Sequence, residues 1–377
     1  MVQPAFVLGE GLVTCLGDGV AAHAEALAAG MPGPTRIPAG DRVPATPCHL
    51  AAETVLAPAT GSGRLTALLD RVVAQALAGA QLPADAIGRM ALLAGSSCLD
   101  LPWHEDSYVA RTVHPRAPAL GAIATHVAQR FGIAGPVCSF NTACSSSANA
   151  LLYARLMLDA GKAEHVLVIG VEAYNRLSVA GFGSLMLLSR QTYRPFDRER
   201  DGLVLGEGAG ALVLSRTPHA ADTHPVSLSG AASAGDPTSP TGAMPERIAQ
   251  VMTAALDDAA TPVARLTAIK AHGTGTGGND LAEGQAMRML DTALPPFTSL
   301  KPYVGHTLGG CGVIESLLLL AAWRQGFLPA TPGFAIVDPE IGLAPVTAAQ
   351  PLPAEGAVLC NFFGFGGNNT SLVWRRA

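Results

Sequence analysis

Short apolar runs alternate with longer helical segments along most of the chain, and this alternation is the feature that most limits its fold. Runs rich in Val, Leu, Ile and Ala predict strands at 4–14, 89–97, 136–140, 165–173 and 208–215. Apolar residues at helical spacing predict helices at 65–80, 119–131 and 146–161. Because strands that are apolar on both faces are buried on both, we predict an α/β fold with helices on either side of mixed or parallel sheets.

The same order recurs in the second part of the chain. Strands at 225–233 and 265–273 alternate with helices at 245–260 and 280–290, before a helix at 313–323 and two final strands. Both sets end in a glycine-rich turn that leads into an apolar strand, at 206–214 and at 364–374. We therefore predict two similar halves, 1–220 and 221–377. The proline-rich stretch 31–60 is expected to be a surface excursion rather than a domain.

Composition excludes several classes of protein. Of the 377 residues, 49% are apolar and 14% charged, which suits a large core and not a disordered chain. The net charge is −5 and no Lys/Arg-rich run occurs, so neither nucleic acid nor an anionic membrane is an expected partner. No apolar stretch reaches the roughly 18–20 residues of a membrane span, and the N-terminus lacks the basic start of a signal peptide.

Cysteine usage indicates a reducing compartment. The chain has seven cysteines, an odd number, and none form a C-x-x-C pair. This pattern favours free thiols in the cytoplasm over a disulfide framework or a zinc site.

One cysteine has a position that suits a nucleophile. Cys144, in "CSFNTACSSSANALL", lies between a predicted strand and a predicted helix. The free N–H groups and positive dipole end of a first helical turn favour a thiolate. We therefore expect the helix to lower the pKa of Cys144. The other cysteines are expected to be core residues; they are Cys15, Cys48, Cys98, Cys138, Cys311 and Cys360.

Two histidines occupy comparable turns. His272 follows a strand in "AIKAHGTGTGGNDLAEG", and His306 in "SLKPYVGHTLGGCGVIE" precedes the last long helix. Ligands bind at such strand ends in α/β sheets, and the adjacent glycines let a substrate approach the backbone. We expect Cys144 and both histidines to share one site.

Five segments of the chain, in order, resemble the signature blocks of the β-ketoacyl-[acyl-carrier-protein] synthases of the thiolase superfamily. They are "NTACSSSANAL", "YRPFDRERDGLVLGEGAGALVL", "KAHGTGTGGNDLAEG", "LKPYVGHTLGGCGVIES" and "NFFGFGGNNTSLVW". The resemblance implies a thiolase fold, with two similar α/β halves stacked as a five-layer α-β-α-β-α sandwich. It also implies an elongating condensing enzyme of fatty-acid or type II polyketide synthesis that needs no metal or organic cofactor.

The resemblance assigns roles to the site residues. Cys144 matches the nucleophile that takes an acyl group from a carrier protein, and His272 and His306 match the pair that stabilises the enolate left when malonyl loses CO2. Backbone N–H groups of Cys144 and Phe363 match the second oxyanion site, and Phe363 also matches the gating aromatic residue. Lys301 and Glu315 either fix a histidine's orientation and tautomer or form a plain structural ion pair.

Other polar segments are expected to be structural. Asp280 and Glu283 lie at i and i+3 near a helix start, where they suit the helix dipole better than a hydrolytic carboxylate pair. The "PFDRERDG" segment is expected to pack near the site. Met186 stands where some relatives carry an arginine that contacts the carrier, and Arg111 and Arg116 are candidate substitutes.

The expected partners are acyl and malonyl carrier proteins and a second synthase-like chain. The strand at 136–140 is apolar and carries no charge to protect a free edge, which predicts a dimer through this strand. A homodimer is the default, and a heterodimer with a chain-length-factor-like partner is the alternative. The chain could itself be such a factor, but these normally lack the cysteine. Biosynthetic thiolases use a second cysteine as base, which does not fit this chain. A cysteine hydrolase that uses Cys144 with one histidine leaves the second histidine and the two halves unexplained.

Overall fold

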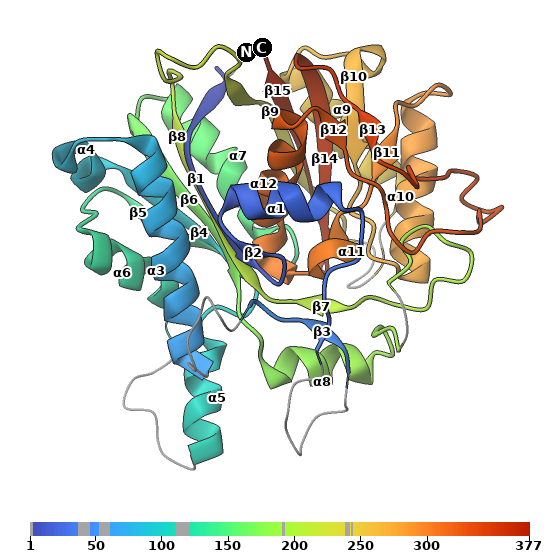
Figure 1. The fold of residues 1–377 in the computed structure, drawn as a ribbon, viewed down its shortest axis with the longest axis horizontal. Coiled ribbons are helices and arrows are strands. Elements are labelled where there is room, and N and C mark those ends of the chain that lie inside the picture. Colours follow the sequence, from blue (N-terminus) through green and yellow to red (C-terminus); the bar gives the residue numbers. More distant parts are fainter. Residues whose placement is uncertain are drawn as a thin grey trace.

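A computed structural model of the protein describes residues 3–36, 46–52, 61–110, 119, 121–190, 193–237, 242 and 244–377. The strands divide into two sets with the same neighbour order (Figure 1). The first set is β1 (Ala5–Thr14), β8 (Gly208–Ser215), β6 (His165–Glu172), β4 (Ala91–Gly95) and β5 (Val137–Phe140). The second set is β9 (Val226–Gly235), β15 (Asn368–Arg376), β14 (Gly356–Gly364), β10 (Leu266–Lys270) and β11 (Phe297–Thr298).

Strand directions repeat as well as strand order. In each set the first three strands pair antiparallel and the last three pair parallel. The sets join where β1 pairs antiparallel with β9 over Ala5↔Leu228 and Phe6↔Ser227, so both belong to one continuous sheet; below, the first and the second sheet are the parts that the two sets form. The predicted boundary between the halves, near residue 220, falls in the connection from β8 to β9. Three short pairs lie outside this order: β2 (Gly17–Asp18) with β1, β3 (Cys48–His49) with β7 (Leu205–Gly206), and β12 (Phe327–Leu328) with β13 (Gln350–Pro351).

Helices complete five layers, as the resemblance implied. Helices α3 (Gly61–Ala80) and α6 (Ala122–Phe131) cover the outer face of the first sheet, and α9 (Pro245–Asp258) and α10 (Gly277–Leu290) cover that of the second (Figure 1). Between the sheets lie α7 (Ser146–Asp159) and α12 (Cys311–Arg324). The remaining helices are α1 (Val20–Ala28), α4 (Ala84–Arg89), α5 (Leu101–Ala110), α8 (Arg176–Ser184), α11 (Lys301–Val304) and the 3₁₀ turns Val263–Arg265 and Leu308–Gly310.

The central layer explains why α12 is apolar on all sides. Every residue from Cys311 to Trp323 is buried, as expected for a helix with sheets on both of its faces. Glu315 lies within this helix, and a buried carboxylate needs partners. In the described part of the chain, no helix is long and apolar enough to cross a membrane.

Two predictions concerning the surface have different outcomes. Part of the proline-rich stretch 31–60, and both Arg111 and Arg116, lie outside the described residues.

The prediction that Cys138 is a core residue is wrong for the single chain, because β5 is the terminal strand of its sheet and Cys138 is exposed. Val137 is exposed beside it, so the strand leaves an apolar edge uncovered within the described chain.

Candidate active site

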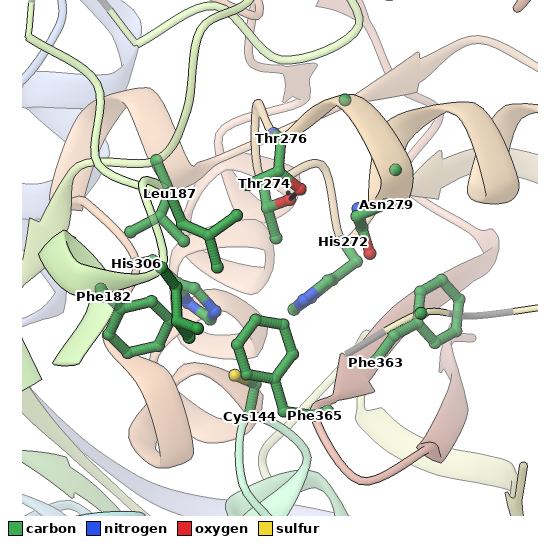
Figure 2. A pocket seen from close by; sticks show the side chains of 16 residues that line it. Cys144, Phe182, Leu187, His272, Thr274, Thr276, Asn279, His306, Phe363 and Phe365 are labelled. Carbon is green, nitrogen blue, oxygen red and sulfur yellow. Dashed lines mark hydrogen bonds between the residues drawn. The ribbon is translucent and has the colours of Figure 1, made fainter. Parts of the chain in front are cut away.

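Three loops from both halves of the molecule meet at one cavity. Cys144 precedes α7, His272 follows β10, and His306 follows the short helix α11. All three line a cavity of about 220 Å³ together with Phe182, Phe363 and Phe365 (Figure 2). The sequence predicted that the cysteine and the two histidines share a site, and the structure brings them together.

Cys144 sits in a tight, close-packed turn. Ala143, immediately before it, has φ of 51°, in the left-handed region that non-glycine residues seldom adopt. Gly364, at the end of β14, packs directly on this turn: a Cβ there would lie 2.8 Å from the carbonyl oxygen of Thr142 and 3.2 Å from the amide nitrogen of Cys144. Glycine at 364 therefore lets the second half of the chain approach the nucleophile.

The predicted lowering of the thiol pKa is wrong for this closed cavity. Burial raises the pKa of the Cys144 thiol to about 12, although Lys301 and the backbone N–H of Phe365 act in the opposite direction. Desolvation of the thiolate exceeds the stabilisation from the helix start and the nearby lysine. Cys144 is therefore a neutral thiol at rest and needs a proton acceptor to react.

The two histidines lie edge to face. Their ring centroids are 5.3 Å apart at an interplanar angle of 82°. The Lys301 Nζ lies 3.4 Å from His272 Nδ1, and since an ammonium has no lone pair, Nδ1 must accept and Nε2 must carry the ring proton. Burial, then Lys301, hold the pKa of both rings well below the ordinary value of histidine. Both imidazoles are therefore neutral.

Lys301 and Glu315 form the predicted ion pair, but a third residue joins it. Glu315 Oε1 accepts from Lys301 Nζ and Oε2 accepts from Lys270 Nζ, each at 2.5 Å, and all three side chains are fully buried. Burial disfavours the ammonium of Lys301, yet Glu315 raises its pKa. Sequence reasoning missed Lys270, although a lysine inside an otherwise apolar strand, two residues before His272, was a usable signal.

Two buried carboxylates fix the loop that carries His272. Glu283 accepts from the backbone N–H groups of His272 and Gly273 at 2.7 and 2.8 Å. Asp280 accepts from the backbone N–H groups of Phe196 and Thr274 at 2.7 and 2.9 Å. Asp280 does lie in the first turn of α10, but Glu283 lies beyond it, so the dipole prediction is incomplete. Burial raises the pKa of Glu283 to about 7.

The aromatic residue that meets the cysteine is not the predicted one. Phe363 lies within β14 opposite Asn369, with its ring 5.6 Å from that of His272, and points away from Cys144 in Figure 2. The backbone N–H that bonds to the Cys144 sulfur belongs to Phe365, in the turn after the strand. The end of the strand explains the difference, because β14 ends at Gly364: Phe363 is paired within the sheet, while Phe365 lies in the turn that follows.

Helix α8, which the sequence did not predict, supplies a further wall. Its Phe182 stacks on Phe365 with ring centroids 5.7 Å apart. The usable signal was Asn175, whose side chain accepts from the N–H of Ser178 as an N-cap. Met186, just after the helix, is 87% exposed, so its apolar side chain is presented to solvent near the cavity.

Family models match both halves of the chain. The description "Beta-ketoacyl synthase, N-terminal domain" applies to residues 57–220, and "Beta-ketoacyl synthase, C-terminal domain" to residues 226–335. A Streptomyces cyaneus protein described as putative polyketide beta-ketoacyl synthase 1 is 32% identical over 290 residues, which are 72% of this chain and 68% of that protein. The 3-oxoacyl-[acyl-carrier-protein] synthase 2 of Vibrio cholerae is 33% identical over 273 residues, 65% of this chain and 63% of that protein.

Solved structures match over the whole chain. A β-ketoacyl synthase from Burkholderia phymatum has a TM-score of 0.86 at 29% identity, covering 100% of both chains. A structure of a ketosynthase with its chain length factor from Xenorhabdus doucetiae gives a TM-score of 0.85 at 28% identity, covering 100% of this chain and 98% of the matched one. The fold is therefore that of the condensing enzymes. The chain belongs to the β-ketoacyl synthase family.

No group of three or more His, Cys, Asp or Glu side chains among the described residues is arranged to hold a metal ion. The acidic side chains nearest the cavity are occupied by backbone N–H groups and lysines, as described above.

Proposed function

We propose that this protein condenses an acyl group held on Cys144 with malonyl-acyl carrier protein, releasing CO2 and forming β-ketoacyl-acyl carrier protein. One observation carries the proposal: two neutral histidines face each other 5.3 Å apart in the cavity that contains the cysteine. A hydrolase needs one histidine as base, whereas decarboxylation of malonyl gains from two donors on one developing enolate.

Loading comes first. The neutral Cys144 thiol passes its proton to a neutral imidazole, and the sulfur attacks the carbonyl carbon of the acyl-carrier thioester. The resulting oxyanion takes hydrogen bonds from backbone N–H groups at the turn, those of Cys144 and Phe365. When the intermediate collapses, the carrier thiol leaves with a proton and the acyl group stays on Cys144.

Decarboxylation follows. The malonyl thioester oxygen takes hydrogen bonds from the histidines, of which His272 donates from Nε2 because Lys301 occupies its Nδ1. The bond to the malonyl carboxylate breaks, its electron pair forms the enolate, and CO2 departs. Because the donors are in place before the charge develops, little reorganisation is needed.

Condensation then forms the new carbon–carbon bond. The enolate carbon attacks the acyl-Cys144 carbonyl, the same backbone N–H groups hold the second oxyanion, and the thiolate leaves and takes up a proton. The ring of Phe365, stacked on Phe182, stands beside the sulfur and is the residue we assign as gate in place of Phe363.

The pathway and the assembly are part of the proposal. Relatives named for fatty-acid and for polyketide synthesis support either primary or specialised type II synthesis, including aryl-polyene assembly. The uncovered edge of β5, with exposed Tyr153 and Leu156 on the adjoining α7, supports a dimer. A homodimer is the default, and the solved ketosynthase–chain length factor complex keeps a heterodimer as the alternative. We place the protein in the cytoplasm, where a catalytic thiol stays reduced.

A mass-spectrometric assay tests the proposal. The protein is incubated with a panel of acyl carriers and malonyl carrier, and both the protein and the products are weighed intact. We expect one acyl adduct and a chain extended by two carbons, both absent in Cys144→Ala and both retained in Cys138→Ser, which removes an exposed thiol. An adduct of equal yield in Cys144→Ala would refute the assignment of Cys144 as the acylated nucleophile. Absence of any adduct, with co-purification of a second synthase-like chain, would favour the chain-length-factor role.

A further inference from the structure

Two lysines from different elements share a single carboxylate beneath the active site. Lys270 ends β10, Lys301 begins α11, and Glu315 lies in the first half of α12. Each ammonium is 2.5 Å from its own oxygen of Glu315, and none of the three side chains has any exposed surface. The cluster therefore carries two positive charges and one negative charge out of contact with water.

Lys270 has used all its donors. Its Nζ bonds Glu315 Oε2, donates to the carbonyl oxygen of Asn361 at 2.9 Å, and lies 3.8 Å from the centroid of the Phe362 ring. A carboxylate, a carbonyl and a ring face are all partners that an ammonium prefers and a neutral amine does not. These contacts suit an ammonium, and they leave Lys270 no free N–H to give to a substrate.

Lys301 differs from Lys270 because it contacts a histidine of the site. Besides Glu315, it contacts His272 Nδ1 and so sets the tautomer of that ring. If Glu315 had Lys301 as its single partner, the carboxylate would neutralise the charge next to the histidine. Because Lys270 claims the second oxygen, the cluster keeps a net positive charge.

Burial shifts the other titratable groups around His272 toward their neutral forms. Glu283 of α10 accepts from the backbone N–H groups of His272 and Gly273, and Asp280 accepts from that of Thr274; burial raises the pKa of both carboxyls, that of Glu283 to about 7. Cys311 of α12 and Cys144 are neutral thiols, with pKa values raised by burial. His306 faces the ring and is itself neutral.

We propose that Lys270 is a positioning residue for the condensation: it shares Glu315 with Lys301, leaves Lys301 to hold His272, and keeps an uncompensated positive charge behind the two histidines. This inference rests on the proposed function. The charge disfavours imidazolium, so both rings remain neutral at rest, and His272 keeps its Nε2–H for donation to the enolate. It also stabilises the negative charge of that enolate.

The pKa values agree in direction. Burial is the largest cause that lowers the pKa of His272, followed by Lys301, His306 and Lys270. For His306 the order is burial, Lys301 and Lys270. Removing the Lys270 charge therefore raises the pKa of both rings.

The test compares two neutral variants with one charge control. Lys270→Met removes the charge and the donor, while Lys270→Gln removes the charge but keeps an N–H for Glu315 or Asn361. Arg71→Met removes one positive charge from the ion pair between Arg71 of α3 and Asp18 of β2, neither of which lines the cavity. The pH profile of CO2 release from malonyl carrier is measured for each, from about pH 5 to about pH 9.

We expect the acid side of the pH profile of CO2 release to move to higher pH by about one unit in both Lys270 variants and not at all in Arg71→Met. Activity at neutral pH should fall about tenfold or more. If Lys270→Met does not fold, Lys270→Gln carries the test. Wild-type acid limbs in the Lys270 variants would overturn the proposal. The proposal would also be overturned if Lys270→Met lost activity equally at every pH and Lys270→Gln restored it, because Lys270 would then act through its hydrogen bonds and not through its charge.

A second readout separates this proposal from the proposed function. Titration of carbon-13-labelled histidine rings by NMR needs no turnover, and it should show two rings that titrate at higher pH in Lys270→Met than in the wild type. Their assignments come from His272→Gln and His306→Gln. If the wild type has no condensing activity but Lys270→Met still shows the higher histidine pKa values, the proposed function is refuted and the charge effect stands. If the wild type is active but the histidine pKa values do not change in Lys270→Met, the charge effect alone is refuted.

Discussion

Replacing Glu315 by glutamine should make the buried charge cluster destabilise the fold. The substitution keeps the size of the side chain but leaves two fully buried ammonium groups facing one neutral amide. Two positive charges a few ångströms apart repel by about 3 kcal/mol at an effective dielectric constant of about 20. Loss of one member of a buried ion pair typically costs about 3–5 kcal/mol. We expect the free energy of unfolding at neutral pH to fall by that amount, with a drop in Tm of roughly 5 °C.

The pH dependence gives the loss a signature. Repulsion lowers the folded-state pKa of one lysine below its unfolded value, so the folded variant binds fewer protons than the unfolded chain. Stability of Glu315→Gln therefore rises as pH increases through that lowered pKa, and the deficit against the wild type shrinks between pH 7 and about pH 10.

Urea unfolding followed by circular dichroism at both pH values measures these effects. The double variant Lys270→Met/Glu315→Gln removes the repulsion and should regain about 3 kcal/mol of the loss. A deficit below about 1 kcal/mol in Glu315→Gln, or no recovery in the double variant, would refute the view that Glu315 separates two charged lysines.

Three further outcomes can be checked with standard assays. His306→Ala should slow CO2 release about a hundred- to a thousandfold and slow acylation of Cys144 less, and equal loss of both steps would contradict the assignment of His306 to the enolate. Gly364→Ala should slow both steps at least about tenfold, since the added methyl meets backbone atoms at 2.8 and 3.2 Å; a wild-type rate would show that the turn yields freely. Cys138 should resist maleimide labelling in the assembled protein, because the proposed dimer pairs β5 across its axis, and light scattering that finds an active monomer would refute the edge argument.

Much of the fold could be predicted from periodicity, because buried strands and helices leave strong apolar patterns. Strand β6 was predicted at 165–173 and runs from His165 to Glu172, and α7 was predicted at 146–161 and ends at Asp159. Helix α8 was missed because "RLSVAGFGS" contains two glycines and two serines, which weaken the helical signal. Tertiary packing, not propensity, holds such a helix in place.

The site was predictable in its reactive residues and not in their electrostatics. The strand-to-helix turn marked Cys144, and the glycine-flanked turns marked His272 and His306. The pKa of Cys144 was predicted with the wrong sign, because the helix start is visible in the sequence while the depth of burial is not. Lys270 was missed for a similar reason, since its partners are 45 and 91 residues away. The choice between Phe363 and Phe365 depended on where β14 ends.

The central layer has a consequence for the newly made chain. Its hydrophobic core is built jointly from α7 of the first half and α12 of the second, with strands of both sheets packed around them. The two halves are alike in topology, yet neither has a complete core until the other is present. During synthesis Cys144 emerges well before His272, Lys301 and His306. The thiol therefore leaves the ribosome before the groups proposed to activate it, and the proposed acyl transfer requires the completely folded chain.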